Sequence, residues 1–183
     1  GLSGRALVAA WRKTAGEVAE LYSGADPKRR LKWAGPDMSA RSSITARLME
    51  TWAHGQEVYD TLGVERVNAD RIRNIAHLGV STFGWTYAVR NMAVPEKMPH
   101  VRLTAPSGAI WTWGEPDADS AVIGDATEFC QVVTQVRNIA DTRLECVGAI
   151  AREWMGMAQC FAGRAEPPPA PGTRFRRAGR PAA

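Results

Sequence analysis

Cysteine is scarce in this sequence of 183 residues and is not arranged for metal or redox chemistry. The three cysteines, Cys130, Cys146 and Cys160, are an odd number, and no two of them have the C-x-x-C spacing of a zinc or redox site. Each of them lies in an apolar segment. We therefore expect buried, reduced thiols and no disulfide framework.

Long apolar runs and targeting signals are also lacking. No run reaches the ~20 residues that a membrane span needs, and no secretory signal is visible. These absences predict a cytoplasmic protein that does not contact a membrane. The chain begins at Gly1 and not at a methionine, so we expect an N-terminally truncated protein.

The charge pattern lacks the basic patch of a nucleic-acid-binding domain. The formal net charge is +4, but the tail at residues 164–183 alone holds five arginines against the single acid Glu166. Residues 1–163 therefore have no net charge, and no nucleic-acid partner is expected. Nucleophile elbows, P-loops and Rossmann glycine motifs are absent too, which leaves the common hydrolase and nucleotide-binding classes without support.

Helical periodicity dominates the first half of the chain. Apolar residues recur at helical spacing over residues 5–22 and 40–62, and a third helix is predicted over residues 69–92. Serines at 39, 42 and 43 are candidate caps for the second helix, and Gly63 follows its end. Residues 1–94 are therefore interpreted as one helical domain.

The second half of the chain has strand-forming segments as well as helical ones. Two β-prone runs at 101–104 and 109–113 surround a glycine-containing turn and predict a hairpin. A helical region at 125–138, a strand at 142–147 and a closing helix at 150–161 follow. The predicted class is α+β, with a small β-β-α-β-α domain over residues 95–163 and a disordered Pro/Arg-rich tail over 164–183.

One pair of residues on the second helix has the chemistry of a metal site. Glu50 and His54 are four residues apart, so on a helix their side chains project together. Carboxylate oxygen and imidazole nitrogen both bind zinc. The same spacing also produces ordinary solvent-facing ion pairs. His77 on the third helix is either a third ligand or a hydrogen-bonded interface histidine, and the sequence leaves both open.

Residues 45–56 (TARLMETWAHGQ) closely resemble the last bundle helix of a group of actinobacterial DinB-like proteins that includes the mycothiol-dependent maleylpyruvate isomerase. Shorter stretches at 36–39, 75–79, 103–106, 111–114 and 124–137 are similar to the same family. The resemblance covers nearly the whole chain except its tail.

The resemblance implies a four-helix bundle that carries a divalent metal, followed by a small α/β domain. Of three metal ligands, Glu50 and His54 match two, and the third, an early histidine, has no match in this sequence. The helix at 5–22 would be the third of the bundle, which would therefore be incomplete. Arg137 is the closest match to an arginine that holds the acidic substrate, although an ordinary surface arginine fits equally well.

Two classes of function remain open on this basis. In the first, a zinc-like ion activates a low-molecular-weight thiol, mycothiol by resemblance, for isomerisation or S-transfer on a small electrophilic acid. In the second, the chain is a non-catalytic metal-binding or interaction module, or an inactive fragment that lacks a metal ligand. An incomplete bundle would also leave apolar helix faces exposed, and we expect self-association through them.

Overall fold

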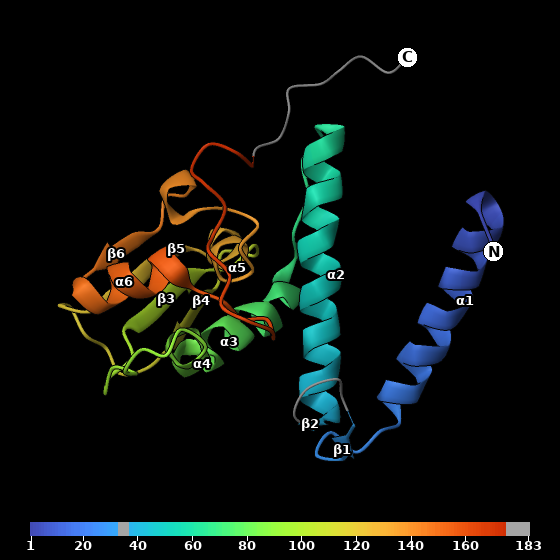
Figure 1. Cartoon of the computed structure of the whole chain (residues 1–183), viewed down its shortest axis with the longest axis horizontal. Coiled ribbons are helices and arrows are strands. Elements are labelled where there is room, and N and C mark those ends of the chain that lie inside the picture. The colour runs from blue at the N-terminus through green and yellow to red at the C-terminus, as the bar shows by residue number, and fades with distance from the viewer. Residues whose placement is uncertain (33–36, 175–183) are drawn as a thin grey trace. The chain divides into compact units, whose positions relative to one another are not determined.

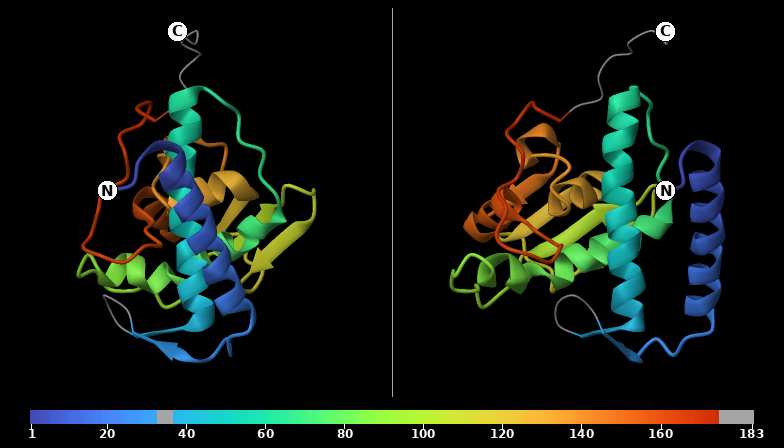
Figure 2. Two further views of the ribbon diagram at one scale, coloured as in Figure 1. Left: turned by 90° about the vertical axis from the view of Figure 1, so that its right-hand side faces the viewer. Right: turned by 45° about the vertical axis from the view of Figure 1, so that its right-hand side comes forward.

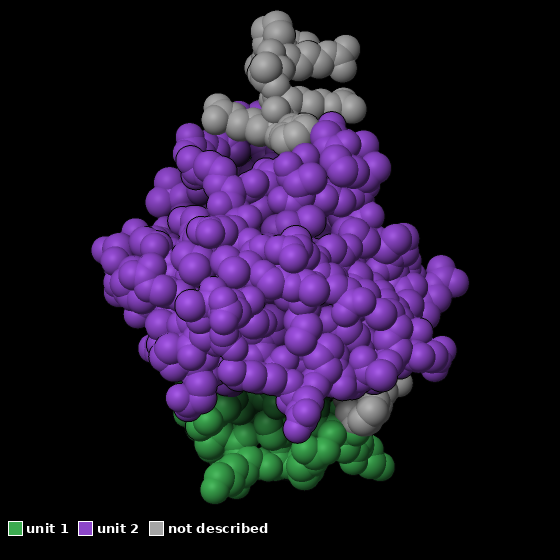
Figure 3. Space-filling model, turned by 90° about the vertical axis from the view of Figure 1, so that its left-hand side faces the viewer, with its two compact units in different colours: residues 1–45 green, residues 46–183 purple. Residues whose placement is uncertain are grey.

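The computed structural model describes residues 1–32 and 37–174. These residues divide into two compact units, Gly1–Thr45 and Ala46–Ala183, coloured separately in Figure 3. The division falls inside the second long helix, and the domain boundary expected near residue 94 stays a prediction. Within the described residues, no helix has the length and apolar character that crossing a membrane would require.

The first unit contains one long helix and a short strand pair. Helix α1 (Gly4–Ser23) confirms the prediction for residues 5–22, and Gly24 ends it. Strands β1 (Arg30–Leu31) and β2 (Met38–Ser39) pair in antiparallel fashion and lead into helix α2 (Ala40–Leu62). The Tyr22 hydroxyl lies 2.8 Å from the Ser43 hydroxyl and so links α1 to the start of α2.

Helix α2 matches its predicted bounds, because its start is capped as the sequence indicated. The Ser42 amide donates to the Ser39 hydroxyl at 3.1 Å, which satisfies one of the free amides at a helix N-terminus. In the second unit, Trp52 is buried on one face of α2. Its indole donates to the Asn68 side chain, and the Arg66 guanidinium lies over its ring and donates to its carbonyl. These contacts hold the segment after α2 against the side of the helix.

The predicted third helix at 69–92 is wrong as a single element. The structure has a 3-10 turn, η1 (Asp70–Ile72), then helix α3 (Arg73–Ser81) and helix α4 (Phe83–Ala88). The break lies at Thr82, whose hydroxyl donates to the carbonyls of Leu78 and Gly79. A threonine hydroxyl that donates to the preceding turn in this way bends a helix. The spacing of apolar residues does not predict such a break.

The second unit is built on a four-stranded sheet with the order β4-β3-β5-β6. Its strands are β3 (His100–Thr104), β4 (Ile110–Trp113), β5 (Ala121–Asp125) and β6 (Glu145–Val147). The predicted hairpin is confirmed as the antiparallel pair of β3 and β4. Strand β5 was missed, and it pairs in parallel with β3 and antiparallel with β6. The α+β class is confirmed, with one strand more than the predicted order.

Helices lie beside this sheet (Figure 1), and the buried core of the unit contains several aromatic side chains. Helix α5 (Ala126–Val133) is capped by the Asp125 carboxylate, which accepts from two amides of its first turn. A 3-10 turn, η2 (Ile139–Asp141), precedes β6, and helix α6 (Ala149–Met157) follows it. Trp154 of α6 is fully buried and meets the rings of Phe83 and Phe129 edge to face.

The first residues of the tail make hydrogen bonds with the rest of the second unit. We call residues 164–174 the C-terminal segment; residues 175–183 lie outside the described residues. The backbone of this segment is bound at Glu166, whose carbonyl accepts from Arg90 and Gln135. Further along, Asn138 donates to the Pro169 carbonyl and the Gly172 amide donates to Asp141. Figure 2 shows the segment, in red, running toward the C-terminal half of α2.

A buried ion pair joins α2 to the turn that follows α5. Both guanidinium nitrogens Nη1 and Nη2 of Arg137 lie 2.7 Å from the Asp60 carboxylate, and the two side chains are only 10% and 14% exposed. Gln56 donates to the same carboxylate. Burial alone would raise the pKa of Asp60, but the hydrogen bonds from Arg137 and Gln56 outweigh it, so the pKa is lowered.

The burial of the three cysteines predicts that their thiols differ in reactivity. Burial raises the pKa of Cys130 and Cys160, and also that of the half-buried Cys146. A raised pKa leaves the thiol protonated and unreactive near neutral pH. With a disulfide reagent at pH 8, we expect slow labelling of Cys146 and none of the other two until the protein unfolds. Fast native labelling of Cys130 or Cys160, mapped by mass spectrometry, would contradict this packing.

The Asp60–Arg137 pair predicts a loss of stability and a change in its pH dependence. Arg137→Ala removes the ionic partner of a largely buried carboxylate and leaves it the Gln56 hydrogen bond, which costs on the order of 3 kcal/mol of unfolding free energy. The pKa of Asp60 is lowered on folding, so its contribution is present above the unfolded value and is lost as pH falls through the folded value. Urea unfolding between pH 3 and 7 should therefore show a smaller loss for Asp60→Asn at pH 3 than at pH 7. A loss independent of pH would contradict the pairing.

Candidate functional site

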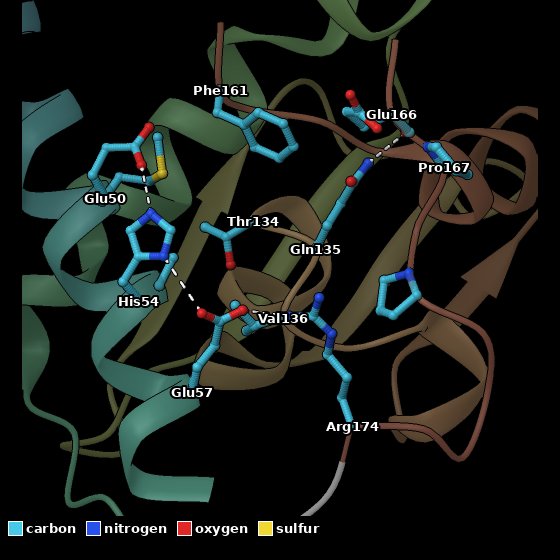
Figure 4. A pocket seen from close by; sticks show the side chains of 13 residues that line it. Glu50, His54, Glu57, Thr134, Gln135, Val136, Phe161, Glu166, Pro167 and Arg174 are labelled. Carbon is cyan, nitrogen blue, oxygen red and sulfur yellow. Dashed lines mark hydrogen bonds and ion pairs between the residues drawn. The ribbon is translucent and has the colours of Figure 1, made fainter. Parts of the chain in front are cut away.

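A pocket of about 410 Å³ lies between α2 and the C-terminal part of the second unit (Figure 4). Three stretches form its walls, and all of them belong to this unit. They are one edge of α2 from Met49 to Glu57, the turn at 134–136, and a C-terminal wall with Phe161, Glu166, Pro167, Pro169 and Arg174. Side chains that are far apart in the sequence are thus brought around one open space.

The predicted metal ligands line this pocket from α2. The Nε2 atom of His54 lies 3.4 Å from Oε2 of Glu50, as the i,i+4 spacing on a helix requires. The side chains are 75% and 53% exposed, so a solvated ion can approach both. The carboxylate and imidazole therefore fit two positions of a zinc site in chemistry and direction.

The described residues supply only this partial donor set. Among them, no group of three His, Cys, Asp or Glu side chains is placed to hold a metal ion. Cys160 is buried near Glu50. Burial is the larger cause of its raised pKa, and the charge of the Glu50 carboxylate is the second.

The second carboxylate beside His54 was not predicted. Glu57 lies one turn further along α2, and its Oε2 atom is 3.5 Å from Nδ1 of His54. Its other oxygen accepts from Nη1 of Arg174, at the end of the C-terminal segment. His54 is thus flanked by two acids, and Figure 4 shows its ring between them. Helical spacing from His54 was sufficient to find Glu57, whereas nothing in the sequence pointed to Arg174.

The opposite wall is shaped by Gln135. This residue follows the end of α5 and has a positive φ of 57°, an unusual backbone conformation for a residue other than glycine. Its amide nitrogen donates at 3.0 Å to the carbonyls of both Ala158 and Glu166. Gln135 therefore fixes the C-terminal segment in place as part of the wall, a role that sequence reasoning missed.

The other residues singled out from the sequence are engaged elsewhere. Arg137, predicted to bind the substrate, adjoins the pocket residue Val136 but is paired with Asp60. His77 does not line the pocket; its ring accepts from the Trp113 indole and lies 3.4 Å from the Ser81 hydroxyl. His77 therefore has the hydrogen-bonded surroundings of the second alternative. The role of Arg137 in substrate binding stays a prediction.

Known proteins resemble this chain in two ways. Residues 1–59 match the family model described as the mycothiol maleylpyruvate isomerase N-terminal domain. Two uncharacterized proteins of Mycobacterium tuberculosis, from the CDC 1551 and H37Rv strains, are each 46% identical to it over 157 residues. That match covers 86% of this chain and 61% of each relative, so the chain spans about three fifths of their length. No solved structure matches the chain.

The matched residues include both candidate ligands. Glu50 and His54 lie inside the matched range, on the helix whose sequence carried the resemblance. The relatives also confirm the actinobacterial affinity that the resemblance implied. Through residues 1–59, this chain is related to the actinobacterial family of the mycothiol maleylpyruvate isomerase N-terminal domain.

Proposed function

We propose that Glu50 and His54 hold a divalent metal ion, zinc, for thiol-dependent chemistry on a small electrophilic acid. The observation that carries this proposal is their position on the wall of an open pocket, within the range that matches the family. When bound, zinc lowers the pKa of a thiol such as mycothiol and presents it as a thiolate for isomerisation or S-transfer. The chain's own residues supply the binding and the orientation.

The pocket suits a small polar substrate. Its walls combine charged groups on α2 with apolar surface from Phe161, Pro167 and Pro169. In this proposal Arg137 orients the substrate acid by its positive charge from beside the pocket residue Val136, while it stays paired with Asp60. A guanidinium suits recognition of a carboxylate.

The number of metal-donor side chains supports a second candidate function for this chain by itself. A catalytic zinc site takes three protein ligands and keeps one open position. Among residues 1–32 and 37–174, no group of three His, Cys, Asp or Glu side chains is placed to hold a metal ion, and Glu57 faces the other side of the His54 ring from Glu50. We propose that the third comes from a part of the protein outside this chain, so that the chain by itself is a weak, non-catalytic metal binder.

We expect zinc affinity and mycothiol-dependent turnover of the electrophilic acid, by isomerisation or S-transfer, to rise together in a longer form of the protein. The experiment compares this chain with a version extended at its N-terminus, each with His54→Ala. The substrate pair is mycothiol and maleylpyruvate, and calorimetry measures zinc binding. His54→Ala should weaken zinc binding more than about 100-fold, since loss of a direct ligand exceeds loss of an outer partner. His100→Ala, which alters a histidine beside the Gly114 carbonyl, is the matched control.

Three results would separate the candidates. Zinc- and mycothiol-dependent isomerisation or S-transfer by the extended form alone supports the catalytic proposal. Zinc binding that depends on His54, with neither reaction in either form, supports the non-catalytic binder. Zinc binding that is unchanged by His54→Ala contradicts both.

A further inference from the structure

We infer that Glu57 is a positioning residue for the metal site, holding the His54 ring so that Nε2 faces the ion beside Glu50. Arg174 in turn holds Glu57. This inference rests on the proposed function, because it assigns a role to a residue that does not itself bind the ion. It concerns a contact between α2 and the C-terminal segment, both within the second unit.

The two nitrogens of His54 face different acids. Nε2 lies 3.4 Å from Glu50, the proposed co-ligand, and Nδ1 lies 3.5 Å from Glu57. A neutral imidazole carries its proton on one nitrogen and a lone pair on the other. A carboxylate beside Nδ1 accepts the proton there and leaves the Nε2 lone pair free on the side of Glu50. An ion bound to Nε2 beside Glu50 would leave the ring proton on Nδ1, where the Glu57 carboxylate accepts it, so we expect this tautomer in the loaded site.

A carboxylate at this place has a known physical effect on a metal-binding histidine. It fixes the tautomer and the orientation of the ring, and it raises the basicity of the nitrogen that binds the metal. The distance of 3.5 Å is long for a hydrogen bond. We expect this contact to shorten when zinc binds, as catalytic hydrogen bonds do when a site is assembled around its ligand. The role of Glu57 is therefore exerted in the loaded site.

Arg174 sets which oxygen of Glu57 is available. Its Nη1 lies 2.5 Å from Oε1, while Oε2 faces His54. Arg174 is itself held in place, because Asp141 binds the Gly172 amide two residues earlier. A segment 117 residues away from Glu57 in the sequence thus restricts the rotation of its carboxylate. A freely rotating glutamate on a helix surface would have no such restriction.

The test uses the full chain, zinc as the probe, and two readouts. Calorimetry gives the zinc dissociation constant, and nitrogen-15 NMR of labelled histidines reports which His54 nitrogen binds the metal. In the unchanged chain we expect zinc on Nε2 and a proton on Nδ1. Glu57→Ala should weaken zinc binding about 10- to 100-fold and reduce the preference for this tautomer.

Matched variants separate positioning from charge and folding. Glu17→Ala removes a carboxylate from an exposed helix pair with Lys13, and it should leave zinc affinity within about twofold of the unchanged chain, because exposed pairs are weak. Glu57→Gln keeps an acceptor oxygen and should recover part of the affinity. Arg174→Ala should produce a smaller loss than Glu57→Ala, in the same direction. Circular dichroism confirms that the helices are retained.

The outcomes distinguish this inference from the proposed function. If zinc binds through His54 but Glu57→Ala behaves like Glu17→Ala, or if zinc binds through Nδ1, the positioning role is overturned and the metal site stands. If His54→Ala binds zinc as well as the unchanged chain does, the metal site fails and the positioning role fails with it.

Discussion

The ion pair between Asp60 and Arg137 fixes which edge of α2 faces the pocket. Trp52 is buried on the neighbouring face of the helix, and Asp60 is held two turns later by two parallel hydrogen bonds. With those two positions fixed, the helix cannot rotate about its axis without leaving a buried charge unpaired. The polar edge that carries Glu50 and His54 is therefore directed toward the C-terminal wall. The site depends on this pair although neither of its members need touch the ion.

The C-terminal wall is held by polar side chains that bind backbone. Gln159 is 1% exposed and uses both ends of its amide, donating to the carbonyls of Phe161 and Arg164 and accepting from the Glu166 amide and Arg90. A buried amide that is fully satisfied in this way specifies one conformation of the chain around it. Prolines at 167–169 further restrict the unfolded alternatives. The wall is thus a built part of the unit, which explains how Arg174 reaches Glu57.

Local sequence patterns predicted the elements that local interactions determine. The bounds of α1 and α2, the hairpin of β3 and β4, and the placement of Glu50 beside His54 all follow from periodicity, capping and spacing within one element. Strand β5 was missed because it is a central, largely buried strand, so its short apolar run lacks the alternation of a half-exposed strand. Arg174 was unpredictable for a different reason, since its partner lies far away in the sequence and only the folded chain brings them together.

Anomalous diffraction at the zinc edge, from crystals of this chain grown with zinc, tests the central claim most directly. The account predicts a zinc peak about 2.0–2.2 Å from both a Glu50 carboxylate oxygen and Nε2 of His54, on the pocket side of α2. Zinc bound only at other residues, or none beside Glu50 and His54 at saturating concentration, would contradict the claim that this edge of α2 is a metal site.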